Sequence, residues 1–138
     1  MRRISILEDE PVLGKHLRRL LVRRGFAVEL STTLASFTTS ARLRNFDICL
    51  IDFSLPDGDG LDAWQRVRPF HPGARALLMT AFCSRQLTLD AYRAGFDLVL
   101  SKPLDLNLLL HWIDTAPGGF TVVPDSRVRY LAQTSAAA

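Results

Sequence analysis

Among the residues that could do chemistry, one aspartate stands at the end of an apolar run. Asp52 closes the segment DICLID at 47–52, and the segment that follows carries two more carboxylates, Asp57 and Asp59. A carboxylate placed in this way can nucleate a turn, bind a cation or act as a nucleophile. The residues that lie near it in the fold decide among these roles.

Four further polar residues stand at the ends of other apolar runs. Glu8 and Asp9 follow the first run, Thr80 ends a later one, and Lys102 follows the last. Lys102 is one of only two lysines among the 17 Lys and Arg residues, so a lysine at this position in an arginine-rich chain indicates a specific role. Each of these residues can hold a cation or neutralise an anion.

The elements that must position these residues alternate between two hydrophobic periods. Short apolar runs predict strands at 3–8, 27–31, 47–52, 75–80 and 97–101. Patterns with helical spacing lie at about 11–24, 33–44, 59–68, 84–94 and 105–115. Residues typical of helix boundaries agree with this division. Pro11 suits a first helical turn, and Ser84 and Asp105 suit N-caps. Gly25 and Gly95 suit helix ends.

Alternating strand and helix units predict an α/β fold of the flavodoxin-like (βα)5 type. Its five-stranded parallel sheet has the order 2-1-3-4-5, with helices on both faces. Ligands bind such sheets at the carboxyl ends of the strands, where the strand order reverses. We therefore expect Glu8, Asp9, Asp52, Thr80 and Lys102 to converge on one rim of the sheet.

The charges expected at this rim indicate a divalent cation. Three carboxylates and one ammonium group leave two negative charges, and no His or Cys lies near these positions. Oxygen ligands favour Mg²⁺ over Zn²⁺. A carboxylate beside Mg²⁺, a lysine and a hydroxyl is also what phosphoryl transfer to aspartate requires, with Asp52 as the nucleophile and with Lys102 and Thr80 binding phosphoryl oxygens.

Length and composition restrict the class of protein. A chain of 138 residues that is 48% hydrophobic has the size of one compact domain. Its net charge of +3 comes from scattered arginines, which is typical of a solvated helix face rather than of a nucleic-acid surface. No apolar run approaches the length of about 18 residues that a membrane span needs, so we expect a cytoplasmic protein without membrane contact.

Four short motifs give the sequence a resemblance to a known family. ILEDE at 6–10, DFSLPDGDG at 52–60, MTA at 79–81 and SKP at 101–103 occur in order and with the usual separations. Over about residues 3–116 the chain resembles the receiver domain of response regulators in two-component signal transduction systems. Each motif alone is weak, and the four in register on five strand-helix units are specific.

The resemblance implies a function and a set of site residues. A sensor histidine kinase or phosphotransfer protein would donate a phosphoryl group to Asp52. The Mg²⁺ site would use Glu8, Asp9, Asp52 and the main-chain carbonyl of Ser54, and the peptide bond between Lys102 and Pro103 would be cis. Such a domain is not a classical enzyme, since it catalyses only its own Mg²⁺-assisted phosphorylation and slow dephosphorylation.

One position departs from the family pattern. The family has an aromatic residue three positions before the lysine, which fills the space vacated when the threonine moves toward the phosphoryl group. This chain has Val99 there, with Phe96 and Tyr92 as the nearest aromatic substitutes. The alternative is therefore a degenerate receiver that binds partners without phosphorylation. A small phosphatase is a third reading, although Ser54 stands where its second carboxylate would be expected.

The remaining predictions concern the turn after Asp52 and the end of the chain. We expect Asp57 and Asp59 to form that turn and to cap the third helix. Residues 1–116 are predicted to be the receiver domain, and 117–138 a hinge and tail with one strand-like run at FTVV and a second short apolar pattern at VRYL. Either the chain is a stand-alone receiver that acts by protein contact, or the tail begins a linker to an output domain outside this sequence. Nucleic acid would be bound only through that output domain, which could regulate transcription. A homodimer through the fourth helix, fifth strand and fifth helix is a further expectation.

Overall fold

The computed structural model of the chain describes residues 2–115 and 128–130. Parallel strands alternate with helices along the chain, as the sequence predicts. The parallel strands are β1 (Arg3–Leu7), β2 (Ala27–Ser31), β3 (Ile48–Asp52), β6 (Arg75–Thr80) and β7 (Leu98–Ser101). The helices are α1 (Pro11–Arg23), α2 (Leu34–Leu43), α3 (Gly60–Val67), α4 (Arg85–Ala94) and α5 (Leu106–Asp114), and the 3-10 turn η1 (Arg68–Phe70) follows α3.

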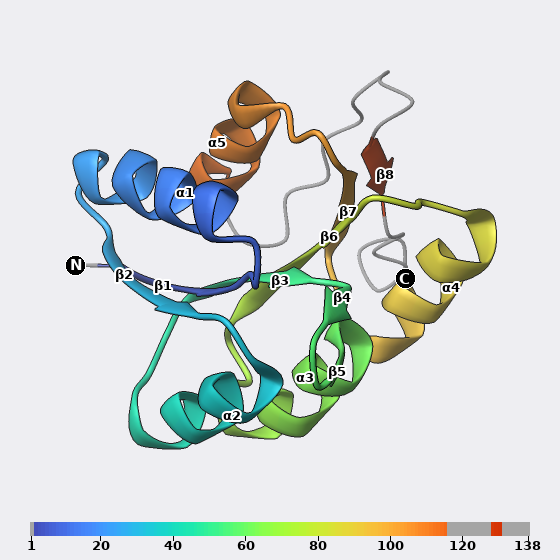
Figure 1. The fold of residues 1–138 in the computed structure, drawn as a ribbon, viewed down its shortest axis with the longest axis horizontal. Helices are drawn as coiled ribbons and strands as arrows, with labels where there is room; N and C mark the ends of the chain where they lie inside the picture. Colours follow the sequence, from blue (N-terminus) through green and yellow to red (C-terminus); the bar gives the residue numbers. More distant parts are fainter. Residues whose placement is uncertain (1, 116–127, 131–138) are drawn as a thin grey trace.

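The sheet has the predicted strand order. Its strands run β2-β1-β3-β6-β7, and β1 is parallel to both β2 and β3. Helices α1 and α5 cover one face, while α2, α3 and α4 lie on the other (Figure 1). In the register of the parallel strands, Asp52 pairs with Met79 and Thr80 pairs with Ser101, so the carboxyl ends of β3, β6 and β7 lie side by side. This alignment confirms the flavodoxin-like arrangement.

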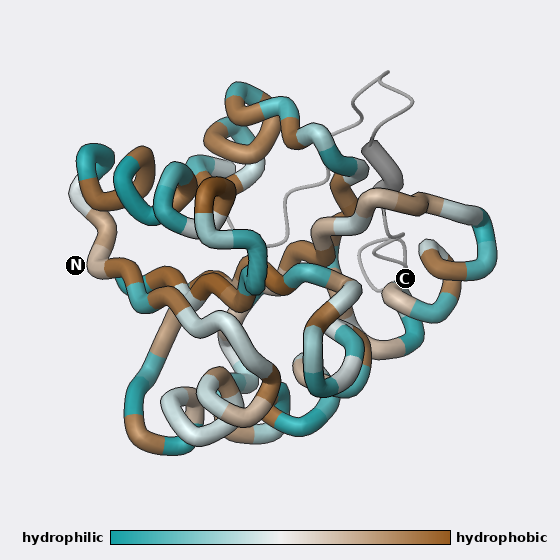
Figure 2. The backbone as a smooth tube through the Cα atoms, viewed as in Figure 1, coloured by the Kyte–Doolittle hydropathy of each residue, from teal (hydrophilic) through white to brown (hydrophobic). Residues whose placement is uncertain are grey.

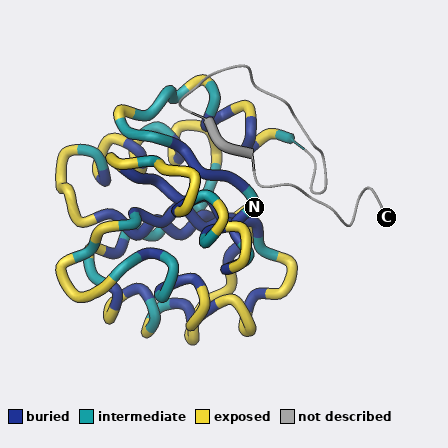
Figure 3. The backbone as a smooth tube through the Cα atoms, turned by 90° about the vertical axis from the view of Figure 1, so that its right-hand side faces the viewer, coloured by how far each residue is buried: buried dark blue, intermediate teal, exposed yellow. Residues whose placement is uncertain are grey.

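The central strands are buried on both faces, which explains why their sequences are almost continuously apolar. Alternate residues of β3 point into two hydrophobic cores: Ile48 and Leu50 join the core under α1 and α5, and Cys49 and Ile51 join the other. The strands at the centre of the molecule are accordingly coloured as hydrophobic in Figure 2 and as buried in Figure 3. Such a core holds the strand ends rigidly and so fixes the residues that follow them.

Helix boundaries follow the sequence signals. Pro11 is the first residue of α1, the Ser84 side chain accepts a hydrogen bond from the Leu87 amide (3.0 Å), and Asp105 caps α5. Gly95 ends α4 in the left-handed conformation, with φ of 94°, which is accessible to glycine at little cost.

Three features were not predicted. Between Asp52 and α3 the chain forms a small antiparallel hairpin of β4 (Ser54–Leu55) and β5 (Gly58–Asp59). Part of the VRYL run forms β8 (Val128–Tyr130), which pairs antiparallel with β7 and becomes a sixth strand of the sheet. The η1 turn is the third feature. The FTVV run at 120–123 lies outside the described residues.

Candidate functional site

Three carboxylates meet at the rim where β1 and β3 end. Glu8 and Asp9 follow β1 directly, Asp52 is the last residue of β3, and one oxygen from each lies within 4.8 Å of the others. Glu8 is 0% exposed and Asp52 is 4% exposed, whereas Asp9 faces solvent. The structure thus brings together the acidic residues that the sequence predicts, in a half-buried cluster open on one side.

Lys102 completes this cluster from the end of β7. Its Nζ lies 2.7 Å from Glu8 Oε1 and 3.3 Å from Asp52 Oδ1. Its backbone is held as well, because the Lys102 amide donates to the Thr80 carbonyl (2.7 Å). The peptide bond between Lys102 and Pro103 is cis, and Pro103 is exposed. The ammonium group therefore bridges the two buried carboxylates.

The electrostatics of the cluster are unbalanced. The pKa of Asp52 is raised to about 7, first by burial and then by the hydrogen bond and charge of Glu8, while the charge of Lys102 offsets only part of the increase. Burial alone would lower the pKa of Lys102, but the hydrogen bond and charge of Glu8 and the charge of Asp52 raise it overall. One ammonium group is therefore too little positive charge for these carboxylates.

A divalent cation fits the residues at this site. The buried Oε1 of Glu8 contacts Lys102 Nζ at 2.7 Å and accepts from no backbone amide or hydroxyl of the described residues, so it can also bind a cation. Three carboxylates and one ammonium group carry a net charge of minus two, which a divalent ion would cancel. Oxygen donors of this kind suit Mg²⁺.

Thr80, the last residue of β6, borders a cleft next to the acidic cluster. The cleft has a volume of about 470 Å³ and is lined by Asp9, Asp52, Ser54, Thr80, Lys102 and six further residues. Thr80 is 2% exposed, and its Oγ1 accepts a hydrogen bond from the Phe82 amide (3.1 Å). Because that oxygen already accepts from an amide, its own hydrogen is available for an acceptor in the cleft.

The position of the missing aromatic residue lies inside the core. Val99 pairs with Leu78 in the sheet and is 0% exposed. Phe96 cannot take the aromatic role, because it precedes β7 at the opposite end of the sheet from Thr80 and its ring packs against Trp64, with centroids 6.1 Å apart. Tyr92 lies on α4, where its side chain is partly exposed.

The structure corrects one prediction about the turn after Asp52. Asp59 does cap α3, since its carboxylate accepts from the Asp62 amide (2.9 Å). Asp57 does not cap α3, because its two oxygens accept from the Leu34 and Ala35 amides of α2 (2.8 and 3.0 Å). The sequence could not show this contact, which joins residues far apart in the chain and depends on how the hairpin lies against α2.

Apolar side chains of α5, one of the elements of the expected dimer surface, belong to the core. Leu109 and Trp112 are buried in the core under α1 and α5, and Leu108 packs against it. Among the described residues, no helix has the length and apolar character needed to cross a membrane.

Comparisons with known proteins identify the family. The model of the response regulator receiver domain matches residues 4–114. The chain is 36% identical over 115 residues to the response regulator protein PilR of Pseudomonas aeruginosa, covering 80% of this chain and 25% of that one. It is 32% identical over 104 residues to the photosynthetic apparatus regulatory protein RegA of Cereibacter sphaeroides, covering 75% of this chain and 56% of that one.

The fold is also similar to that of a solved structure. A response regulator protein from Burkholderia pseudomallei, described with a phosphorylated aspartic acid, a calcium ion and citrate, is 26% identical with a TM-score of 0.78. The match covers 83% of this chain and 68% of that one. The chain therefore spans a quarter of PilR, just over half of RegA and two thirds of the Burkholderia protein. It belongs to the response regulator receiver family of two-component signalling systems.

Proposed function

We propose that this chain accepts a phosphoryl group on Asp52 from a sensor histidine kinase or phosphotransfer protein and thereby switches a partner or an output domain. The observation that carries the proposal is the half-buried cluster in which oxygens of Glu8, Asp9 and Asp52 lie within 4.8 Å of one another, with Lys102 Nζ 3.3 Å from Asp52 Oδ1. A turn-forming aspartate would need neither the other carboxylates nor the ammonium group.

The chemistry follows from the positions of the side chains. An oxygen of ionised Asp52 attacks the phosphorus of the donor phosphohistidine, and the phosphorus–nitrogen bond breaks with its electron pair staying on the imidazole. Lys102, now beside Asp52, would pair with a phosphoryl oxygen and offset the added charge. Thr80 would donate the hydrogen of its hydroxyl to a second phosphoryl oxygen.

The metal ligands in this proposal are the carboxylates of Glu8, Asp9 and Asp52 and the main-chain carbonyl of Ser54. Bound Mg²⁺ would neutralise charge on the carboxylates and on the transferred group. The raised pKa of Asp52 supports this assignment, because a cation at the cluster would favour the ionised form that attacks.

The output step is proposed more coarsely. Residues 1–116 would form the receiver and 117–138 the start of a linker to an output domain, and RegA, a regulatory protein, is one longer relative. Regulation of transcription in the cytoplasm fits this organisation. A homodimer through α4, β7 and α5 has less support, because Leu109 and Trp112 are buried and β8 lies along β7.

One experiment tests the function and separates it from the alternatives. The protein is incubated with acetyl phosphate and Mg²⁺ and then weighed intact. We expect a gain of one phosphoryl group that is lost in Asp52→Asn and kept in Asp114→Asn, a matched change to an exposed carboxylate on α5. No gain in the wild type would support the degenerate receiver, which buried Val99 favours. Repeated turnover of varied phosphate esters would instead indicate a hydrolase.

A further inference from the structure

The hairpin of β4 and β5 joins the acceptor residue to two helices. It begins directly after Asp52 and Phe53, contains Ser54, and ends at Asp59, which caps α3. Phe53 and Leu55 are half-buried and pack against the core, which anchors the first strand of the hairpin. Pro56, Asp57 and Gly58 at the tip are exposed, so burial contributes little there. The position of the tip, and with it the fine placement of the exposed Ser54, therefore depends on specific contacts in addition to this anchor.

The base of the hairpin is fixed against the acceptor strand. The Gly60 amide donates to the Phe53 carbonyl (2.8 Å), and the Phe53 amide donates to the Met79 carbonyl of β6 (2.8 Å). Gly60 lies so close to β3 that a Cβ atom there would be 2.5 Å from the Asp52 carbonyl oxygen. The start and the end of the hairpin are thus locked to the strand that carries Asp52.

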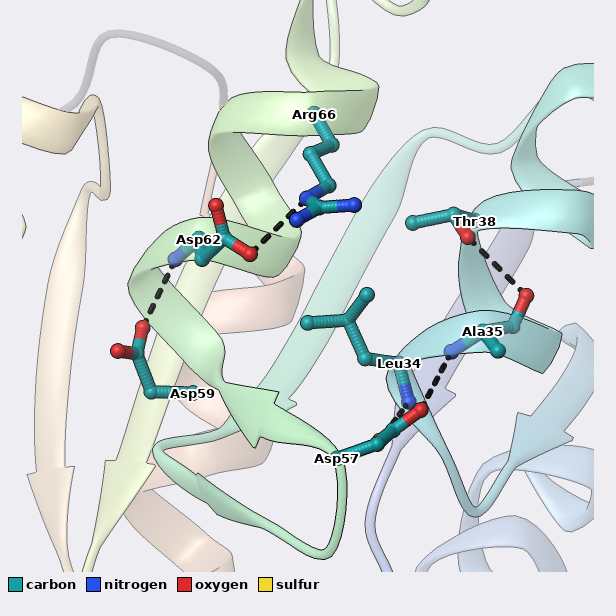
Figure 4. A network of polar contacts seen from close by, with 7 residues as sticks. All are labelled: Leu34, Ala35, Thr38, Asp57, Asp59, Asp62 and Arg66. Carbon is teal, nitrogen blue, oxygen red and sulfur yellow. Dashed lines mark hydrogen bonds and ion pairs between the residues drawn. The ribbon is translucent and has the colours of Figure 1, made fainter.

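Of the two hairpin carboxylates, Asp57 and Asp59, only Asp57 holds the tip of the hairpin against α2. Figure 4 shows the Asp57 carboxylate beneath the first turn of α2, where its oxygens accept from the Leu34 and Ala35 amides (2.8 and 3.0 Å). The hydrogen bonds from the Leu34 and Ala35 amides, the first having the larger effect, lower the pKa of Asp57. The Leu34 side chain also meets the hairpin, since a Cβ atom at Gly58 would lie 2.8 Å from Leu34 Cδ1.

Helix α2 has a cap of its own, so Asp57 does more than complete it. Thr33 Oγ1 accepts from the Ser36 amide (3.1 Å), and Thr33 and Ser36 form a reciprocal capping box. Asp57 adds an acceptor from another part of the chain to the two amides nearest the helix start. The negative charge is also favoured at this end of the helix dipole. The contact therefore links two elements that backbone hydrogen bonds alone do not join.

We propose that Asp57 is a positioning residue for the divalent-cation site. By tying the hairpin tip to α2, it holds Ser54 beside the acidic cluster of Glu8, Asp9 and Asp52, so that the Ser54 carbonyl is available to the cation without a cost of ordering the loop. This inference rests on the proposed function, because the Ser54 carbonyl matters only if the cluster binds Mg²⁺. It predicts that loss of Asp57 weakens Mg²⁺ binding more than it changes the chemistry at saturating Mg²⁺.

The test compares Asp57→Ala with Thr33→Ala, which removes a hydrogen bond at the same helix end without touching the hairpin. Melting temperatures measured against Mg²⁺ concentration give the dissociation constant. We expect Asp57→Ala to raise that constant roughly three- to tenfold, and Thr33→Ala to leave it at the wild-type value. With acetyl phosphate, Asp57→Ala should need more Mg²⁺ but reach a rate within about twofold of wild type at saturation.

A second readout does not depend on Mg²⁺. In metal-free protein, amide hydrogen exchange at residues 53–59 should be faster in Asp57→Ala than in Thr33→Ala. Asp57→Asn, which keeps one acceptor oxygen, should lie between wild type and Asp57→Ala and replaces it if Asp57→Ala does not fold. Equal Mg²⁺ affinity and equal exchange in the Asp57 and Thr33 variants would overturn the proposal.

The outcome also separates this inference from the proposed function. If the wild-type protein binds Mg²⁺ but takes up no phosphoryl group, the function fails while Mg²⁺ affinity still decides the role of Asp57. If phosphoryl uptake needs Asp52 but has the same Mg²⁺ dependence in Asp57→Ala as in wild type, the function stands and the positioning role is rejected.

Discussion

The acidic cluster at the strand ends and the carboxylates of the hairpin contain the same chemical group in opposite situations. Asp52 is buried beside Glu8 and has a pKa raised to about 7. Asp57, a few residues later, is exposed, accepts two amide hydrogen bonds and has a lowered pKa. The difference lies in the supply of donors. Amides that stabilise the charge make Asp57 a structural tie, whereas no amide of the described residues bonds the Asp52 carboxylate, which leaves it open to the cation and phosphoryl group of the proposed function.

The largest expected effect comes from removing the positive charge of the cluster. Lys102→Ala leaves Glu8, which is 0% exposed, without its ion pair, and should destabilise the metal-free protein at pH 8 by on the order of 3 kcal/mol. Lys102→Arg keeps the charge and should lose less. Urea denaturation measures both. Equal stability of Lys102→Ala and wild type would mean that the cluster is not short of positive charge.

The next effect concerns the point at which the two regions join. Gly60→Ala would place a Cβ atom 2.5 Å from the Asp52 carbonyl oxygen, and should cost about 2 kcal/mol because backbone must move. Gly73→Ala is the matched control, since a Cβ there meets nothing within 4 Å. Both are compared by thermal unfolding. A harmless Gly60→Ala would show that hairpin and acceptor strand are less tightly joined than their contacts indicate.

A smaller effect tests the raised pKa of Asp52. In the folded state the pKa of the Asp52 carboxyl is about 7, above its ordinary value of 3.8, so the folded protein binds this proton more tightly than the unfolded chain does. The stability of the metal-free protein should therefore fall as pH rises from about 4 to about 7. Asp52→Asn should lack this fall and be more stable than wild type at pH 8, by on the order of 1 kcal/mol. Parallel stability curves for the two proteins would contradict the assignment.

The smallest effect has the opposite sign and belongs to Asp57. Because the folded-state pKa of Asp57 lies below its ordinary value of 3.8, the stability it contributes is present above that value and lost as pH falls through the folded-state pKa. The difference in melting temperature between wild type and Asp57→Ala should thus be constant near pH 6 and shrink below about pH 4. A difference that persisted at pH 2 would imply that Asp57 acts by packing rather than by charge.

Local signals in the sequence predicted most of the fold. The apolar runs of the central strands, the caps at Ser84 and Asp105 and the glycine at Gly95 each depend on neighbours in the chain, so their effects can be read directly. The rim residues were also predictable, because parallel strands bring their carboxyl ends to one edge. The strand boundaries differ from the predictions by one residue at most.

What could not be predicted depends on contacts between distant segments. The sequence predicts that Asp57 caps α3, the nearest helix along the chain, whereas the amides that donate to it belong to α2. Strand β8 was unexpected in the same way, since a short apolar run shows neither its partner nor its direction. The burial of Trp112 likewise depends on how α5 rotates against the sheet.

The sixth strand also affects how copies of this chain could aggregate. Exposed sheet edges are templates on which further strands can add, and short edge strands limit this risk. With β8 in place, one side of the sheet ends in a strand of three residues, Val128–Tyr130. The other side ends in β2, which has five residues and is mostly half-buried. Fibre-like growth by strand addition would therefore start at β2, on the side of the sheet opposite to β7.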